Sequence, residues 1–326
     1  MAKARAIVKR RKAVRNIRKI TKTMQMIATA KFQKSLKRAV GTKPYTMKVR
    51  ELVRELAASV GPSVDHPLLR KLTPETTKNR IALVVLTSNR GLAGAYNGSV
   101  LRKANTFLKQ QVAAGKQVDL YVAGKKGATY FNFQKRPITA RFDMADPPRF
   151  TDSDRMAEQF IHSFTTGEID SVHVVYMNFI STGVQKPDVM TLLPLAGVTE
   201  AADQMAQQIA EKEAQIAAGM LDAKRSGADA TFDPHVYDTE TVYDFSPEPK
   251  ELLDELLPLT IKTAFFQSYL DAATSEHVAR MVAMKSATDA ADKMVKSLSM
   301  QYNRARQSQI TTELSEIMGG VEAMKG

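Results

Sequence analysis

One stretch near the carboxyl end decides the fold. From Pro258 to Met318 it reads PLTIKTAFFQSYLDAATSEHVARMVAMKSATDAADKMVKSLSMQYNRARQSQITTELSEIM, with no Gly and no further Pro. Ala, Met, Lys, Gln and Glu dominate it, and all of them favour helices. At about 1.5 Å per residue, this helix would be roughly 90 Å long. Globular helices average about a dozen residues, so a helix of this length needs a partner along its length.

The same stretch carries a narrow apolar stripe. Small or apolar residues recur at alternating spacings of three and four, with one extra residue, as in a coiled-coil seam: Met284, Ala287, Ala291, Met294, Leu298, Tyr302 and Ala305. Beyond Ala305 the seam is expected to turn polar, at Gln309 and Thr312.

The amino-terminal segment supplies the predicted partner. Residues 3 to 40 lack Pro and Gly and carry a second stripe of this kind: Ala13, Ile17, Ile20, Met24, Ile27, Phe32, Leu36 and Val40. Pro44 is expected to interrupt or kink this helix, and Gly61-Pro62 to end the pattern that follows. Two such stripes at opposite ends of one chain predict an antiparallel coiled coil.

Charge is unevenly distributed along the chain. Residues 1 to 50 hold seventeen Lys or Arg and no Asp or Glu, although the whole chain has a net charge of +13. The remaining residues therefore carry a small acidic excess. A helix with no acidic side chain over fifty residues is expected to seek acidic surroundings, either nucleic acid phosphate or an acidic protein surface.

The middle of the chain alternates strands with helices. Apolar segments rich in β-branched residues predict strands at Arg80–Leu86, Gln117–Ala123, Ser171–Phe179 and Val189–Leu195. The helical patterns between them indicate an open, mostly parallel, Rossmann-like α/β domain.

Residues 196 to 241 differ in character, with nine acidic and three basic side chains. We interpret them as an acidic, partly helical excursion from the α/β domain, with a hypothetical regulatory role beside the simpler one of a surface elaboration. The predicted organisation is a basic coiled-coil helix (1–60), a connector (61–79), the α/β domain (80–195), the insertion (196–241), a second connector (242–257) and the long helix (258–326).

No catalytic or cofactor pattern is present in the sequence. The chain has no cysteine, which excludes disulfides and thiolate metal sites, and its five histidines lack ligand spacing. Lys125-Lys126-Gly127 is not a P-loop, and Gly91, Gly94 and Gly98 do not form a dinucleotide fingerprint. We expect these glycines to form tight turns, and we expect no catalytic residue, cofactor or metal.

Three motifs, in order along the chain, resemble the gamma subunits of rotary F-type ATP synthases. They are IRKITKTMQMIATAKFQKS from Ile17, LTSNRGLAGAYN from Leu86 and YNRARQSQITTELSEIMGG from Tyr302. LLPL at Leu192 also matches. The family usually has Asp where Asn89 stands and often has Cys where Ala93 stands.

The resemblance implies a non-catalytic rotor shaft. Its partners would be the ring of three alpha and three beta subunits, the epsilon subunit and the membrane c ring, at the cytoplasmic face of the bacterial inner membrane. Contacts with beta would fall on Arg306, Gln307 and Thr311, and on Met24, for which ordinary seam packing is an equal alternative. The insertion makes the chain longer than short bacterial members, and the lack of cysteine rules out a dithiol switch.

Two other functional classes fit parts of the sequence. A nucleic-acid-binding coiled coil would need base-reading residues and a parallel dimer seam, whereas here the basic region itself carries the seam. A nucleotide-dependent enzyme built on the α/β domain would have to hydrolyse ATP as an isolated chain.

Overall fold

A computed structural model describes residues 2–60, 66–69, 77–143, 145–195 and 249–324. The elements are α1 (Ala2–Val60), a short 3-10 helix η1 (Pro67–Leu69), β1 (Arg80–Leu86), α2 (Tyr96–Ala113), β2 (Gln117–Ala123), α3 (Lys125–Phe133), β3 (Ala140–Phe142), α4 (Phe150–Thr165), β4 (Ser171–Phe179), β5 (Gln185–Leu193) and α6 (Pro249–Ala323). The predicted insertion, 196–241, lies outside the described residues. No helix in the described part of the chain is long and apolar enough to span a membrane.

The two long helices tolerate internal prolines. α1 continues through Pro44, so the helix is not interrupted there, and the alternative of a kink stays a prediction. α6 begins at Pro249 and continues through Pro258. A proline inside a helix costs about 3 kcal/mol through its missing N–H and its ring. Burial on both sides offsets this cost, at Ala39 and Val49 around the first proline and at Leu253 and Ile261 around the second.

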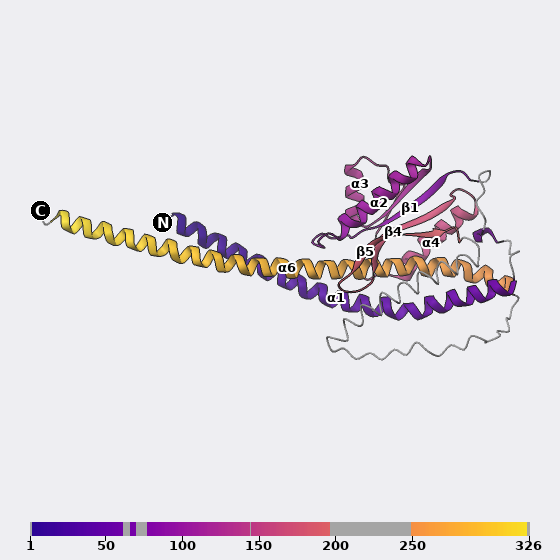
Figure 1. Ribbon diagram of the computed structural model, residues 1–326, viewed down its shortest axis with the longest axis horizontal. Coiled ribbons are helices and arrows are strands. Elements are labelled where there is room, and N and C mark those ends of the chain that lie inside the picture. Colours follow the sequence, from indigo (N-terminus) through magenta and orange to yellow (C-terminus); the bar gives the residue numbers. More distant parts are fainter. Residues whose placement is uncertain (1, 61–65, 70–76, 144, 196–248, 325–326) are drawn as a thin grey trace. The chain divides into compact units, whose positions relative to one another are not determined.

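The strands form one sheet in the order β3-β2-β1-β4-β5 (Figure 1). β1 pairs in parallel with β2 and β4, and β2 pairs in parallel with β3. β5 is antiparallel to β4. This confirms the mostly parallel α/β prediction. Three residues of β3 are too few for a sequence pattern, so this strand was not predicted.

The chain divides into two compact units. The smaller comprises residues 1–31, 92–94 and 277–326, and the larger comprises 32–91 and 95–276. Each unit holds a segment of both long helices.

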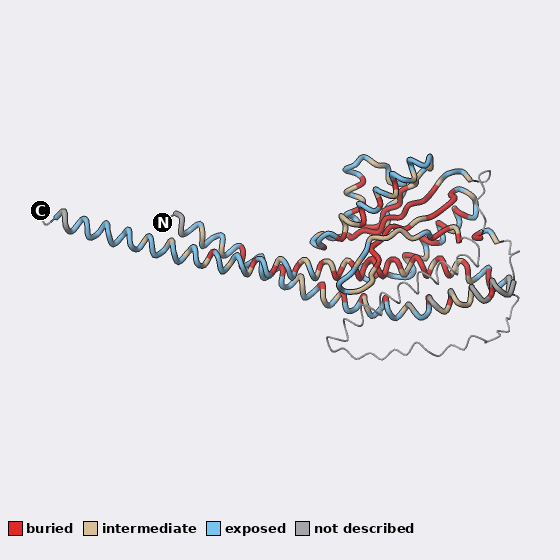
Figure 2. Tube along the Cα trace, in the orientation of Figure 1, coloured by how far each residue is buried: buried red, intermediate tan, exposed pale blue. Residues whose placement is uncertain are grey.

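The larger unit has three layers. One face of the sheet packs against α4 and the long-helix segments through a single core, which includes Leu56, Val84, Phe160, Leu253 and Phe265. Lys262 on α6 also bonds α4, at 2.8 Å from Asp154 Oδ1 and 2.7 Å from Glu158 Oε1. α2 and α3 lie on the opposite face of the sheet (Figure 1). Figure 2 shows burial concentrated along the strands, as expected for a sheet covered on both faces.

Within this unit the long helices are antiparallel. Ser35 Oγ lies 2.8 Å from Thr274 Oγ1, and Thr42 Oγ1 lies 3.1 Å from Gln267 Oε1. The residue numbers of each pair add up to 309, so the register is constant.

Candidate functional site

The smaller unit is a two-helix seam. Val14, Ala291 and Leu298 form a buried cluster, with Ile7 and Val295 packed against it. Thr288 Oγ1 donates a hydrogen bond to Thr21 Oγ1 at 2.8 Å, and their numbers again add up to 309. Arg18 forms an ion pair with Asp292, and the Arg11 guanidinium lies 4.9 Å from the centre of the Tyr302 ring. These contacts confirm the antiparallel coiled coil.

The buried face of α1 agrees only in part with the stripe that hydrophobic periodicity predicts. Phe32 is buried, whereas Ile17, Ile20 and Ile27 are 53 %, 62 % and 48 % exposed. Val14, Thr21 and Ala28 are buried in the seam, where small and hydroxyl-bearing residues let two helix backbones approach closely and bond across the interface. The exposed part of the predicted stripe forms an outer surface, which we name the α1 flank: Ile17, Ile20, Met24 and Ile27.

Met24 lies at the edge between this flank and the seam. Its side chain is half-buried, between buried Thr21 and Ala28 along the helix. A contact with another protein and ordinary seam packing both stay predictions for Met24. Among the residues predicted to form the α6 seam, Met284, Ala291 and Leu298 are buried, but Met294 is 46 % exposed.

Arg306, Gln307 and Thr311 are exposed on α6. The Thr311 hydroxyl donates to the Gln307 carbonyl of its own helix at 3.0 Å. The seam register places Met24 opposite residue 285 or so, about twenty residues from Arg306. At 1.5 Å per residue this is roughly 30 Å along the helix. The structure therefore does not bring Met24 together with the other three residues.

The last turns of α6 extend past the beginning of α1. With the register fixed by Thr21 and Thr288, Ala2 at the start of α1 lies opposite residue 307. Residues 311–321 are all exposed (Figure 2). The seam positions Gln309 and Thr312 are polar, as predicted, and neither is buried.

A second apolar stripe on these turns was missed from the sequence. It lies on a different face of the helix from the seam and comprises Ile310, Leu314, Ile317, Met318 and Val321, each about half exposed or more. Ile310, Leu314, Ile317 and Val321 are spaced by four, three and four residues, which was a readable helical signal. We name it the α6 end stripe.

The turn that precedes α3 offers no free backbone amide to a phosphate. The first amides of α3 are already bonded within the chain: Lys125 N to Asn89 Oδ1, Lys126 N to the Ser88 carbonyl and Gly127 N to Thr87 Oγ1. A helix N-terminus binds an anion through free amides. This arrangement supports the structural interpretation of the glycines.

The histidines in the described residues sit in unrelated surroundings. The His173 ring lies between the Ser171 and Thr191 hydroxyls, at 3.1 and 3.2 Å, and burial lowers its pKa to about 4. Burial also lowers the pKa of His66, against the opposing effect of Asp254. His235 lies outside the described residues. Within the described part of the chain, no three His, Cys, Asp or Glu side chains could together hold a metal ion.

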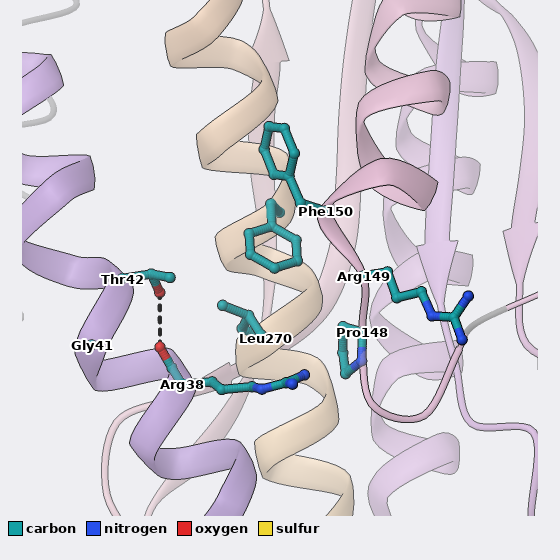
Figure 3. Close-up of a pocket in the computed structure, with 8 residues that line it drawn as sticks. Arg38, Gly41, Thr42, Pro148, Arg149, Phe150 and Leu270 are labelled. Carbon is teal, nitrogen blue, oxygen red and sulfur yellow. Dashed lines mark hydrogen bonds between the residues drawn. The ribbon is translucent and has the colours of Figure 1, made fainter.

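A pocket of about 490 Å³ opens in the larger unit (Figure 3). Its lining is apolar and cationic: Arg38, Gly41, Thr42, Pro148, Arg149, Phe150, Phe266 and Leu270. Figure 3 shows Arg38 reaching from α1 toward Pro148, whereas the Arg149 guanidinium points away. This lining contains no carboxylate or imidazole, so it offers no group for general acid–base chemistry.

Comparison with known proteins places this architecture. The ATP synthase family model matches residues 3–324. The ATP synthase gamma chain of Rhodopirellula baltica is 41% identical, over 100% of both chains. That of Leptospira biflexa is 36% identical, over 99% of this chain and 100% of its own. The chain belongs to the ATP synthase gamma-chain family.

Solved structures agree on the fold of this gamma chain. A rotor chain of the Euglena gracilis mitochondrial ATP synthase gives a TM-score of 0.56 at 16% identity, covering 95% of this chain and 99% of that one. A chain from another rotational state of that enzyme gives 0.58 at 18% identity, covering 99% and 95%.

Asn89 holds the start of α3 in this gamma chain. Its Oδ1 accepts the Lys125 amide at 3.0 Å. An aspartate, which the resemblance implies at this position, would offer the same acceptor with a negative charge.

Proposed function

We propose that this gamma chain is the non-catalytic central shaft of an F-type ATP synthase. In this role the helix pair turns within a ring of three alpha and three beta subunits, while the α/β unit contacts the epsilon subunit and the c ring. Ion-driven rotation of the c ring turns the shaft, which drives the catalytic sites of the ring through their binding states. As part of F1, the chain would lie peripherally at the cytoplasmic face of the bacterial inner membrane, and its similarity to bacterial gamma chains supports this placement.

The observation that carries the proposal is the exposed apolar surface of the smaller unit. The α1 flank and the α6 end stripe are too regular to be scattered surface residues, and large exposed apolar patches mark interaction sites. A helix pair that exposes Ile17, Ile20 and Ile27 along one side is suited to contact surrounding proteins. Its excess of Lys and Arg adds long-range attraction to acidic partners.

We propose that Arg306, Gln307, Thr311 and Met24 contact the beta subunits. The accessibility of the first three and the partial exposure of Met24 support this assignment. Met24 belongs to the α1 flank, and Arg306, Gln307 and Thr311 lie at the start of the α6 end stripe. The shaft would then contact the ring at two levels.

The first test is co-expression with alpha and beta subunits. We expect the chain to co-purify with them in a 1:3:3 ratio, and the isolated chain to show no ATP hydrolysis. Hydrolysis by the isolated chain, or failure to join the ring, would contradict the proposal.

Charge reversal tests the contact residues. Arg306→Glu should impair ATP-driven ion pumping or assembly and leave the isolated chain folded, because the side chain is exposed. Arg304→Glu, two residues away and also exposed, is the matched control. Equal effects of the two variants would show that general charge, and not Arg306, governs the contact.

A further inference from the structure

The charged side chains on the outer helices of the α/β unit, α2 and α3, are all cationic. Neither α2 nor α3 contains an Asp or Glu. Between residues 90 and 141 the chain carries ten Lys or Arg and one acidic residue, Asp119. That carboxylate is already engaged, with its Oδ2 2.6 Å from Arg80 Nε. α4, on the opposite face of the sheet, carries acidic side chains such as Asp154 and Glu158.

Exposed apolar side chains lie at the ends of these two helices. Phe133, the last residue of α3, is 87 % exposed, and Val112, near the end of α2, is 54 % exposed. The surrounding cations are Lys109, Lys116, Lys135 and Arg136. We name these six residues the α2–α3 end patch.

The geometry of the helices brings the patch together. Each helix follows one parallel strand and returns to the start of the next, so their carboxyl ends lie at the same edge of the sheet. Asn105 Nδ2 donates to the Tyr130 hydroxyl at 2.6 Å and links the two helices. Lys109 and Val112 follow Asn105 by four and seven residues, and Phe133 follows Tyr130 by three. Lys109, Val112 and Phe133 therefore lie one or two turns beyond this hydrogen bond, on the sides of α2 and α3 that face each other.

Helix capping and the helix dipole explain only some of the residues in this patch. α2 and α3 both end in a Schellman motif, with Lys116 N bonded to the Gln111 carbonyl and Arg136 N to the Phe131 carbonyl. Cations at helix carboxyl ends also stabilise the helix dipole. Neither effect accounts for a solvated phenylalanine. Lys135 also occupies the left-handed position, with φ of 56°, where α2 uses Gly115.

The acidic groups near this edge interact with the start of β1, where Asp119 and Glu168 act electrostatically on Arg80. Asp170 accepts the amides of Lys78 and Arg80. None of the four patch cations forms an ion pair with any residue in the described ranges.

We propose that the α2–α3 end patch is a peripheral contact site for anionic phospholipid headgroups. Clustered Lys and Arg are attracted to an anionic bilayer surface, and an exposed aromatic ring inserts at the headgroup level. An acidic protein would match the cations equally well. Phe133 and Val112 are the only apolar members of the patch, and so small an apolar surface among four cations favours the bilayer interface over a protein interface. This inference goes beyond the shaft function and does not depend on it.

The absence of tryptophan from the chain allows a direct test. In the full-length chain, Phe133→Trp creates a single fluorescent reporter, which we call the patch reporter. Its emission is compared with and without vesicles of phosphatidylcholine alone and of phosphatidylcholine mixed with phosphatidylglycerol. We expect a blue shift with the mixed vesicles only, reversed by high salt. Tyr45→Trp, at a 54 % exposed position on α1, is the control reporter and should not shift.

Charge variants distinguish vesicle binding by this patch from vesicle binding by the basic α1 helix. Added to the patch reporter, Lys135→Glu with Arg136→Glu should weaken vesicle binding by roughly fivefold or more for each cation. Lys9→Glu with Lys12→Glu, the same charge change on exposed α1 residues, should leave the blue shift of the vesicle-bound patch reporter intact.

Two outcomes would overturn the proposal. Vesicle binding without a blue shift of the patch reporter would assign binding to another surface. A shift with polyglutamate but not with mixed vesicles would identify the patch as a site for an acidic protein.

Discussion

Gly127 has no side chain, which allows α3 to pack closely against the sheet. A Cβ added there would lie 2.7 Å from Thr87 Oγ1 and 2.8 Å from Val122 Cγ1. The Gly127 amide also donates to Thr87 Oγ1 at 2.9 Å, so the helix cannot move away without losing this bond.

Gly127→Ala should therefore lower the free energy of unfolding by about 1–3 kcal/mol, the usual cost of overpacking a core. Urea denaturation of the purified chain measures the change. Gly183→Ala is the matched control, because its new Cβ meets nothing within 4 Å and should change little. Equal stability of the two variants would refute the packing argument.

His173 makes the α/β unit sensitive to acid. Burial, with a smaller contribution from the charge on Lys116, lowers its pKa from 6.5 to about 4. Because the folded-state pKa lies below the unfolded value, the neutral ring contributes its full stability above about pH 6.5. That stability is lost as the pH falls from 6.5 toward 4.

His173→Gln should remove this part of the pH dependence. Between about pH 7 and about pH 4.5, we expect the parent chain to lose about 2 kcal/mol more than the variant. Denaturant titrations at both pH values give the loss of stability for each chain. The titration of the carboxylates is common to both chains, so it cancels in the difference between the two losses. Identical losses in parent and variant would show that the ring titrates in the folded chain as it does in the unfolded chain.

At the scale of elements, the sequence predicted where α1 and α6 form better than it predicted which faces of these helices are buried. Helix-forming composition and the absence of breakers were enough for α1 and α6. Hydrophobic periodicity then assigned Ile17, Ile20 and Ile27 to the seam, and the structure exposes them. Periodicity cannot distinguish a face buried within the chain from one that another protein would cover. The true seam contains Thr21 and Ser35, which carry little hydrophobic signal.

The same limit applies to the candidate site. Arg306, Gln307 and Thr311 came from family resemblance, because exposed polar residues on a helix have no pattern of their own. The α6 end stripe has a helical period. The predicted seam, which turns polar at Gln309 and Thr312, follows a different face of the same helix. Of the two outcomes expected at Pro44, the interruption does not occur, because local propensity cannot anticipate the tertiary packing around this proline.

A matched pair of variants on α1 tests the corrected seam. Ile20→Gln should change the free energy of unfolding by less than about 0.5 kcal/mol, since Ile20 is 62 % exposed. Ala28→Gln places a long polar side chain at a position that is 2 % exposed, and should cost about 2 kcal/mol or more. Thermal or urea unfolding of the isolated chain distinguishes them. The reverse order would restore the periodicity-based seam.

At the scale of the whole molecule, a shaft that transmits torque must have two helices that turn together. Thr21 Oγ1 and Thr288 Oγ1 lie 2.8 Å apart across the seam, and the chain has no cysteine of its own. Thr21→Cys with Thr288→Cys therefore creates one disulfide pair between residues 267 apart in sequence. Closing so long a loop in the unfolded chain should stabilise the fold by about 5 kcal/mol at most.

In the assembled enzyme, oxidising this pair should leave ATP hydrolysis and ion pumping unchanged, because both cysteines belong to the same rotating body. Ser35→Cys with Thr274→Cys is the control in the larger unit, where the hydroxyl oxygens also lie 2.8 Å apart. Activity is compared before and after reduction of the same sample. A loss that reduction restores would mean that the helices must separate or slide during turnover, and a shaft that works as one stiff body would then be excluded. Unchanged activity would instead locate all the necessary motion between the helix pair and the proteins around it, where the exposed isoleucines lie.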